Sequence, residues 1–294
     1  MRHGRWRFLL GALVPALVLH VVFVLSPYAQ AFYLSLTDWT GVSGEAHYVG
    51  AGNYARLGGD SLFLDAVRNN AVMLAVVPLA TIALGLGLAA LLRTRRGASG
   101  YQIVYFFPQL LSLVVIGVLW SFVYNPNTGL LNSGLRAVGL GFFARSWLAE
   151  PGFALVAVMA VLVWSSVGFY VVLFRAAIDG IPAELYEAAL LDGAGGWTTF
   201  RRLTLPLVRE TVQVAFVYLG IAALDGFAVV QVMTVGPGGP DGATEVIGLS
   251  LYRNAFTYGR FGYASAMGVA LFFATLTLAV LALRAGRRER VELA

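Results

Sequence analysis

The chain has 294 residues, of which 59% are hydrophobic and 12% are charged, and its mean hydropathy is +0.77. Soluble domains carry about 25% charged residues, so this composition excludes a soluble protein and predicts a membrane protein. The net charge of +5 comes from arginines that gather between apolar runs, so it gives no reason to expect a nucleic-acid partner.

Six apolar stretches are long enough to cross a hydrocarbon core, which takes about 20 residues. They predict an all-α, polytopic membrane protein that forms one transmembrane domain over residues 1–294. The expected spans cover residues 8–25, 71–92, 103–124, 153–174, 212–235 and 264–283.

The arginines predict the orientation of these spans. Six spans place both ends of the chain on one side of the membrane, and 14 of the 20 arginines lie on that side, in residues 1–7, 93–102, 175–211 and 284–294. By the positive-inside rule, both termini are expected in the cytoplasm.

The first span has an alternative interpretation as a secretory signal. A basic start and an apolar run precede Ala29-Gln30-Ala31, which is typical of a cleavage site. Because the apolar character continues past Gln30 and exceeds the roughly 7 to 15 residues of a signal core, we favour a retained span.

Two external segments, 37–70 and 125–152, are rich in Gly, Asn and aromatic residues. Each is shorter than a domain of about 100 residues, so we expect them to fold against the mouth of the bundle and to meet a partner there. Their tryptophans and tyrosines are typical of membrane-interface anchors.

A polar segment of about residues 181–206 separates the fourth and fifth spans. Pro182, Glu184 and Glu187 favour the start of a short helix, and Gly193 favours its end. A second short helix is expected from Trp197 to the Leu205-Pro206 break. The pattern predicts a helix, a sharp turn and a helix outside the bilayer, with a small-residue tip that another protein can approach closely.

Polar residues inside the later spans are candidates for a solute pathway. Thr211, Tyr218 and Asp225 recur every seven residues and therefore share a helical face. A carboxylate in a span usually faces the bundle interior or water, which makes Asp225 the strongest candidate. Ser265 and Thr275 of the sixth span are further candidates, although helix packing explains such hydroxyls equally well.

The loop 236–242 is so rich in Gly and Pro that it must interrupt the fifth span. Residues 243–258 are then expected to be external or re-entrant. Irregular backbone at membrane depth is tolerated only where protein or water covers it, which favours a loop in the gate region, while an ordinary surface hairpin is the alternative.

Several kinds of chemistry have no support in the sequence. Cysteine and lysine are absent, so a thiolate site and the lysine of a P-loop are both excluded, and the chain is not an ATPase. The histidines His3, His20 and His47 lack metal-ligand spacing. We therefore expect no catalytic residue, no metal site and no cofactor on this chain.

The polar segment resembles the cytoplasmic EAA loop of permease subunits in bacterial ABC importers, which has a Glu-Ala-Ala, a later Gly and an aliphatic-x-Leu-Pro. Further matches over nearly the whole chain are similar to the carbohydrate-type permeases, the maltose and glycerol-phosphate importers among them. The EAA matches are Glu187, Ala188, Ala189, Gly193, Leu203, Leu205 and Pro206; the further ones are Ser35-Leu36-Thr37-Asp38-Trp39, Gly52-Asn53-Tyr54, Asn125-Pro126, Gly129-Leu130-Leu131-Asn132, Gly238-Gly239-Pro240, Tyr252-Arg253 and Ala255-Phe256.

Three departures from the family pattern stand out. Leu190-Leu191 occupy positions that are more usually basic or polar, Gly236-Pro237 are an insertion, and no large domain follows the first spans. The last removes any expectation of the extended periplasmic domain that some maltose-type subunits carry.

The resemblance implies a multi-pass permease in a bacterial cytoplasmic membrane that forms half of a pore. The implied partners are a second homologous permease, two ATPase subunits that bind the ATP, and an extracytoplasmic binding protein that delivers a sugar or sugar-like solute. It also implies that the ATPase-coupling residues are Glu187, Ala188, Ala189, Asp192 and Gly193. The alternatives are an ion-coupled secondary transporter and an ABC permease for a non-sugar solute.

Overall fold

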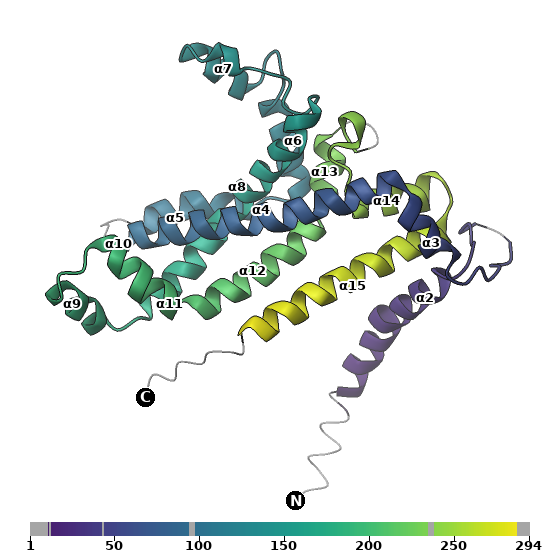
Figure 1. Ribbon diagram of the computed structural model, residues 1–294, viewed down its shortest axis with the longest axis horizontal. Helices are drawn as coiled ribbons and strands as arrows, with labels where there is room; N and C mark the ends of the chain where they lie inside the picture. The colour runs from purple at the N-terminus through teal and green to yellow at the C-terminus, as the bar shows by residue number, and fades with distance from the viewer. Residues whose placement is uncertain (1–10, 12, 43, 94–97, 235–237, 287–294) are drawn as a thin grey trace, which may run out of the picture. The chain divides into compact units, whose positions relative to one another are not determined.

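The structure is a computed structural model that describes residues 11, 13–42, 44–93, 98–234 and 238–286. Within these residues the one β pairing is an isolated bridge between Thr37 and Tyr48, which confirms the predicted all-α class. The helices are α2 (Ser26–Leu34), α3 (Gly52–Gly59), α4 (Ser61–Leu92), α5 (Ala98–Phe106), α6 (Leu113–Val123), α7 (Leu130–Ala137), α8 (Pro151–Asp179), α9 (Ala183–Leu191), α10 (Gly196–Thr199), α11 (Leu205–Leu207), α12 (Arg209–Leu224), α13 (Phe227–Met233), α14 (Ile247–Tyr252) and α15 (Phe261–Gly286) (Figure 1).

The chain divides into two compact units that interleave along the sequence. The first comprises Met1–Leu64 and Ser250–Phe273, and the second Asp65–Leu249 and Ala274–Ala294. The single transmembrane domain over residues 1–294 stays a prediction.

In the first unit, two segments that the sequence singled out separately are bonded to each other. The Asn53 side chain, which is buried, donates to the carbonyls of Ser35 and Thr37, at 2.8 Å each. The hydroxyls of Ser35 and Tyr54 lie 2.7 Å apart. Helix α3 is thereby fixed to the turn that follows α2.

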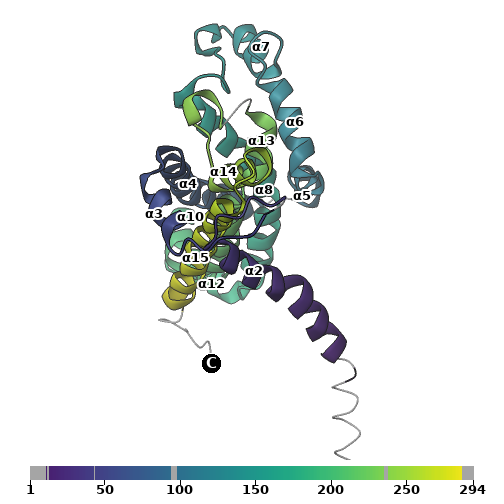
Figure 2. The ribbon, with the colours of Figure 1, turned by 90° about the vertical axis from the view of Figure 1, so that its right-hand side faces the viewer.

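The second unit is built around α8. Its core combines Phe174 of α8, Leu86 of α4 and Leu219 of α12, all of which are buried. Helix α5 crosses α8 so closely at Gly168 that any Cβ there would overlap the Tyr105 carbonyl. Figures 1 and 2 both show α6 and α7 standing away from the part of the unit where α5 and α8 pack.

The candidate membrane spans are partly continuous and partly bent. Four helices are long and apolar enough to cross a membrane by themselves: Leu13–Leu34, Ser61–Leu92, Pro151–Asp179 and Phe261–Leu281. Two bent pairs bring the number to as many as six if each pair is one span. In the described residues the first span thus ends at Leu34, well beyond the predicted residue 25; the predicted start at residue 8 lies outside them.

The third span is not the continuous helix predicted over residues 103–124. Ile103–Leu110 and Leu113–Val123 meet at an angle of 108°. Pro108 lies in a tight helical turn, Phe107–Leu110, and Leu111 and Ser112 then take extended backbone angles. Because proline supplies no N–H and fixes its own φ, the α-helical hydrogen-bond ladder stops there.

The fifth span also differs from the prediction over residues 212–235. Helix α12 begins at Arg209, after a 71° bend from Gly196–Leu207, and ends at Leu224; the short α13 follows the break at Asp225 and Gly226. A Cβ at Gly226 would lie 2.8 Å from Cε of Met73, so α4 packs directly against this break.

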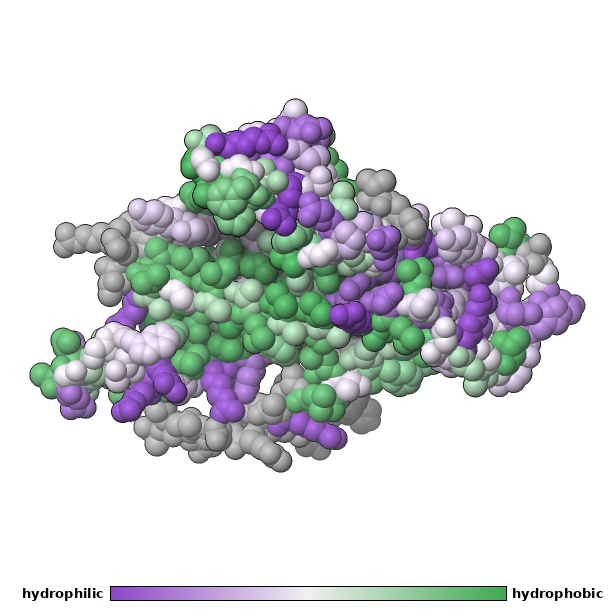
Figure 3. Space-filling model, turned by 45° about the horizontal axis from the view of Figure 1, so that its top comes forward, coloured by the Kyte–Doolittle hydropathy of each residue, from purple (hydrophilic) through white to green (hydrophobic). Residues whose placement is uncertain are grey.

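The exposed surface suits a membrane environment. Figure 3 shows apolar side chains gathered into a broad field on one face, with hydrophilic ones at its edges. Ile103, Val104, Leu110 and Phe122 are among the exposed large apolar residues of the second unit. Soluble monomers rarely expose contiguous apolar patches above a few hundred Å². Such a face belongs in lipid or against another membrane subunit.

Candidate coupling segment and solute path

The polar segment 181–206 is the candidate coupling segment. Its first predicted helix is α9, and the end of this helix is sharply defined. The amide of Gly193 donates to the carbonyl of Leu190 (3.0 Å), and that of Ala194 donates to Ala189 (2.9 Å). With φ of +73° at Gly193, this is a Schellman turn, which satisfies the last carbonyls of the helix. Gly193 is needed there because the left-handed region is strained for other residues.

The tip of this segment is open to solvent. Glu187, Ala188, Asp192 and Gly193 are exposed, and Ala189 is partly buried. Among the large apolar residues of the segment, the two family departures are the most exposed: Leu190 is 75% exposed and Leu191 is 89% exposed. The tip therefore presents two leucines beside the small residues that the sequence emphasised.

Tyr186 holds α9 to the rest of the second unit, and the sequence analysis missed it. Its hydroxyl lies 3.2 Å from the hydroxyl of the buried Thr204, and the guanidinium carbon of Arg93 lies 3.3 Å from its ring centroid. These residues line a cavity of about 450 Å³ together with Ile178 and Phe200. The only sequence signal was an aromatic residue on an otherwise small-residue helix face.

The second predicted helix of the segment is present and runs without interruption from Gly196 to Leu207. The short α10 is followed by one π-helical turn, Phe200–Thr204, and by α11, in which Pro206 occupies a first-turn position. The indole of Trp197, which is exposed, stacks on Phe200 with ring centroids 5.7 Å apart.

The solute-path candidates are only partly brought together. Tyr218 of α12 and Asp225, just past its end, are both exposed, and the backbone amide of Asp225 still donates to the Ile221 carbonyl at 3.1 Å. Among the described residues, no hydrogen bond or ion pair engages the Asp225 carboxylate. Ser265 and Thr275 are half-buried on α15, but they belong to different units, so the structure does not place the four residues around one path.

The described part of the Gly-rich loop is tightly folded. Gly238, Gly239, Asp241 and Gly242 all have positive φ, and both the amide and the hydroxyl of Thr244 donate to the Gly238 carbonyl, at 2.8 and 2.7 Å. The predicted insertion Gly236-Pro237 lies outside the described residues. A cavity of about 470 Å³ lies between this loop, at Gly239 and Pro240, and a wall formed by α6 and the loop after α7.

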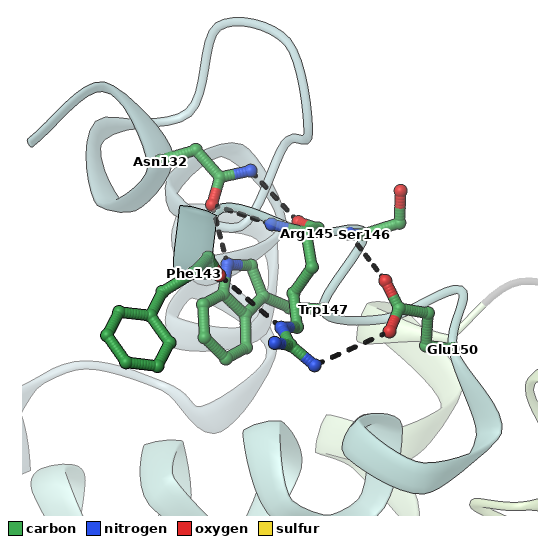
Figure 4. Close-up of polar contacts among 6 residues, drawn as sticks. All are labelled: Asn132, Phe143, Arg145, Ser146, Trp147 and Glu150. Carbon is green, nitrogen blue, oxygen red and sulfur yellow. Dashed lines mark hydrogen bonds and ion pairs between the residues drawn. The ribbon is translucent and has the colours of Figure 1, made fainter. Parts of the chain in front are cut away.

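That loop is organised by Asn132 of α7, which is buried (Figure 4). Its side-chain nitrogen donates to the carbonyls of Pro126 (3.1 Å) and Arg145 (2.9 Å), and its oxygen accepts from the indole N–H of Trp147 (2.8 Å). Glu150 accepts from the Ser146 amide (3.2 Å) and lies 3.8 Å from the Arg145 guanidinium. Trp147, which the sequence analysis interpreted as an interface anchor, is thus part of a hydrogen-bonded loop.

Comparison with known proteins gives the chain its family. Residues 81–290 match the family described as "Binding-protein-dependent transport system inner membrane component". The chain is 46% identical over 288 residues to the diacetylchitobiose uptake system permease protein NgcF of Streptomyces coelicolor, covering 94% of this chain and 81% of NgcF. It is 31% identical over 291 residues to the multiple sugar-binding transport system permease protein MsmF of Streptococcus mutans, covering 99% and 97%.

A solved structure has the same fold. It is the crystal structure of a bacterial alginate ABC transporter in complex with an alginate pentasaccharide-bound periplasmic protein, and one of its chains superposes with a TM-score of 0.83 at 23% identity, covering 97% of this chain and 96% of that one. The family match extends over α9, the break after α12 and the Gly-rich loop. The chain therefore belongs to the family of binding-protein-dependent transport system inner membrane components.

Proposed function

We propose that this chain is the permease subunit of an ABC importer and that it translocates a sugar or sugar-like solute. The observation that carries the proposal is an exposed helix, α9, closed by a Gly193 Schellman turn, in a chain of this transport family. The sugar class is supported by the names of two relatives, which transport diacetylchitobiose and multiple sugars. Proteins of this family are permeases, so the chain is not an enzyme.

The complete importer needs partners that this chain does not supply. We infer a second permease, two ATPase subunits that bind the ATP, and an extracytoplasmic binding protein, in a bacterial cytoplasmic membrane with both termini inside. In this assembly Glu187 makes a charged contact with an ATPase, Ala188 and Ala189 allow close approach, and Asp192 with Gly193 forms the turn that enters the ATPase cleft.

Substitutions at the tip test the coupling role. Gly193→Asp adds a side chain at a position with positive φ, and Glu187→Lys reverses an exposed charge. We expect both variants to insert into the membrane, to lose ATP-dependent uptake and to release the ATPase during purification. Glu184→Lys is the matched control, because it makes the same charge change on α9 away from the tip.

Full uptake and a normal complex in either tip variant would overturn the coupling assignment. The driving force is tested separately in vesicles that contain the whole importer. Uptake that requires ATP and persists without an ion gradient supports the proposal, whereas uptake driven by a proton or sodium gradient without ATP identifies a secondary transporter.

A further inference from the structure

Two adjacent asparagines on α4, Asn69 and Asn70, connect parts of the second unit that are distant in sequence. Asn70 is 2% exposed. Its side-chain nitrogen donates to the carbonyl of Leu224 at 3.3 Å, and its side-chain oxygen accepts from the amide of Ile247 at 2.8 Å. One side chain thus joins α4 to the end of α12 and to the start of α14.

Both partners of Asn70 are backbone groups at helix ends. Leu224 is the last residue of α12, and Ile247 is the first of α14; both are buried. The last carbonyls and first amides of a helix have no partner within the helix, and leaving them unpaired away from water is costly. A primary amide suits this position because its nitrogen donates and its oxygen accepts, so the two partners together fix which way the amide is oriented.

Asn69 binds the loop that lies between these helix ends. Its side-chain nitrogen donates to the carbonyls of Glu245 (2.9 Å) and Gly242 (3.4 Å). The loop is already closed on itself by the two bonds from Thr244 to the Gly238 carbonyl. Residues 238–247 therefore form one folded piece that is attached to α4 by two neighbouring amides.

The attached pieces are those on which the proposed solute path depends. Asp225 directly follows Leu224, and Gly239 and Pro240 form one wall of the 470 Å³ cavity, opposite Tyr124 and Ser146. We propose that Asn69 and Asn70 are positioning residues for transport: they fix the Asp225 break and loop 238–247 to α4, so that both move with α4 when the importer changes state.

This inference rests on the proposed function, because the change of state is that of an importer cycle. It assigns to the asparagines a role beyond filling the core. A purely structural amide would lower stability when removed but would leave the amount of solute transported per ATP unchanged. A positioning amide affects the amount of solute transported per ATP. Without it, the Asp225 break and loop 238–247 are no longer fixed to α4 and do not move with that helix.

The test uses the complete importer, reconstituted in proteoliposomes with its binding protein and solute. Asn70→Leu removes both helix-end bonds at similar volume, and Asn69→Leu removes only the loop bonds. Asn254→Leu is the matched control, because the amide of Asn254 is also buried but donates to the Ser250 carbonyl in its own turn and to Sδ of Met267, and among the described residues it has no hydrogen bond to the Asp225 break or to loop 238–247. Three quantities are measured for each: thermal stability, solute transported per ATP hydrolysed, and amide hydrogen exchange.

We expect Asn70→Leu to speed exchange about tenfold or more both near residue 224 and across residues 238–250, because two buried hydrogen bonds are lost. Transport per ATP should fall severalfold relative to the Asn254→Leu complex of equal stability. Asn69→Leu should affect the loop alone and reduce the ratio less; it also serves as the test variant if the Asn70→Leu complex does not assemble.

If an assembled Asn69 or Asn70 variant matches the Asn254→Leu control in amide hydrogen exchange or in solute transported per ATP, the positioning role is wrong. Failure of the proposed function gives a different result, because the wild-type complex itself would then show no ATP-dependent uptake.

Discussion

Gly193 closes α9 with a backbone conformation that suits glycine, and no neighbouring atom lies within 4 Å of where a Cβ would stand. A substitution there is therefore a test of conformation and not of packing. The turn matters beyond local stability, because the bonds from Gly193 and Ala194 set where the exposed tip ends.

Gly193→Ala should destabilise the turn by about 1 to 2 kcal/mol, the cost of a left-handed residue with a Cβ. We expect faster amide exchange at Ala194 and a partial loss of uptake. Gly193→Asn is the comparison, because asparagine tolerates the left-handed region better than alanine does. Its exchange rate at Ala194 and its uptake should lie between those of Gly193→Ala and of the wild type. Equal exchange in all three proteins would show that the turn is not held by the conformation of residue 193.

Asp225 carries the sharpest prediction about the solute path. Burying a lone carboxylate against lipid costs about 2.5 to 3.5 kcal/mol on the insertion scale, so its exposure at the break after α12 points to water or another subunit. Asp225→Asn should impair or retune uptake while assembly stays normal, and Asp225→Ala should be worse. Sugar hydroxyls both donate and accept hydrogen bonds, which a carboxylate can use.

Uptake kinetics and Tm of the same reconstituted complexes separate the path role from an ion pair with a partner subunit. An ion-pair role lowers Tm and yield in both variants, and a second substitution that restores stability restores uptake. Unaltered kinetics in a stable Asp225→Ala complex would end the path interpretation.

At the scale of elements, the loop 125–150 shows how side-chain hydrogen bonds can order a short segment that has no hydrophobic core of its own. Asn132 bonds to Pro126, Arg145 and Trp147, and the Arg145 guanidinium lies 4.0 Å from the Phe153 ring centroid. The loop is therefore a fixed surface beside the 470 Å³ cavity, to which Ser146 contributes.

Asn132→Ala leaves the Trp147 N–H and the Arg145 carbonyl without their Asn132 partner, whereas the Pro126 carbonyl keeps its bond from Arg136. A buried unsatisfied group costs about 1 to 3 kcal/mol. We expect faster amide exchange throughout residues 126–150, which include α7, while the other helices of the second unit stay unaffected. Binding of the solute-loaded binding protein, measured on the reconstituted importer, should weaken as the loop loses order. The substitution Asn127→Ala serves as the control, because that side chain is exposed; similar exchange in the two variants would contradict the organising role of Asn132.

The sequence predicted the helical class and α9 from local patterns, since apolar run length and the Gly193 stop depend on neighbouring residues alone. It predicted an interruption of the fifth span only at loop 236–242, and it did not predict the break at Asp225 and Gly226 or the bend in the third span. The apolar character continues through Leu111 and through Gly226, so run length gives no sign of a break at either place. The bend in the third span depends on Pro108. The break in the fifth span depends on the contact of Gly226 with Met73 and on the hydrogen bond that Asn70 donates to the Leu224 carbonyl. Pro108 acts locally, whereas the contacts of Gly226 and Asn70 act across the fold, and apolar run length records neither kind of cause.

The same reason explains the mixed result for the candidate sites. The exposed tip of α9 is local and was foreseen, but Tyr186 is identified only by Arg93 and Thr204, which come from other elements. The helical spacing that grouped Thr211, Tyr218 and Asp225 ends one residue early, because α12 stops at Leu224.

At the scale of the whole molecule, the first span bears on membrane topology. Ala29, Gln30 and Ala31, which resemble a cleavage site, lie inside α2, and the ring of Tyr28, which cleavage would remove, packs against Phe272 with 5.7 Å between centroids. Cleavage after Ala31 would remove most of α2 from the first unit. These contacts favour a retained span.

The arginine distribution then predicts the side of each connection. Reporter fusions after Arg96, Arg202 and Ala294 should report cytoplasm, and fusions after Gly59, Gly141 and Gly259 should report the exterior, because 14 of 20 arginines lie on the N-terminal side.

The mass of the purified chain supplies the second measurement, and a retained first span requires residues 1–31 to be present. A mature chain that starts after Ala31 would identify a signal peptide and leave five spans, while a single reversed loop would overturn the six-span arrangement even with an intact N-terminus. The fusions report the side of each connection and the mass reports the length of the chain, so neither measurement depends on the solute or on the partner subunits.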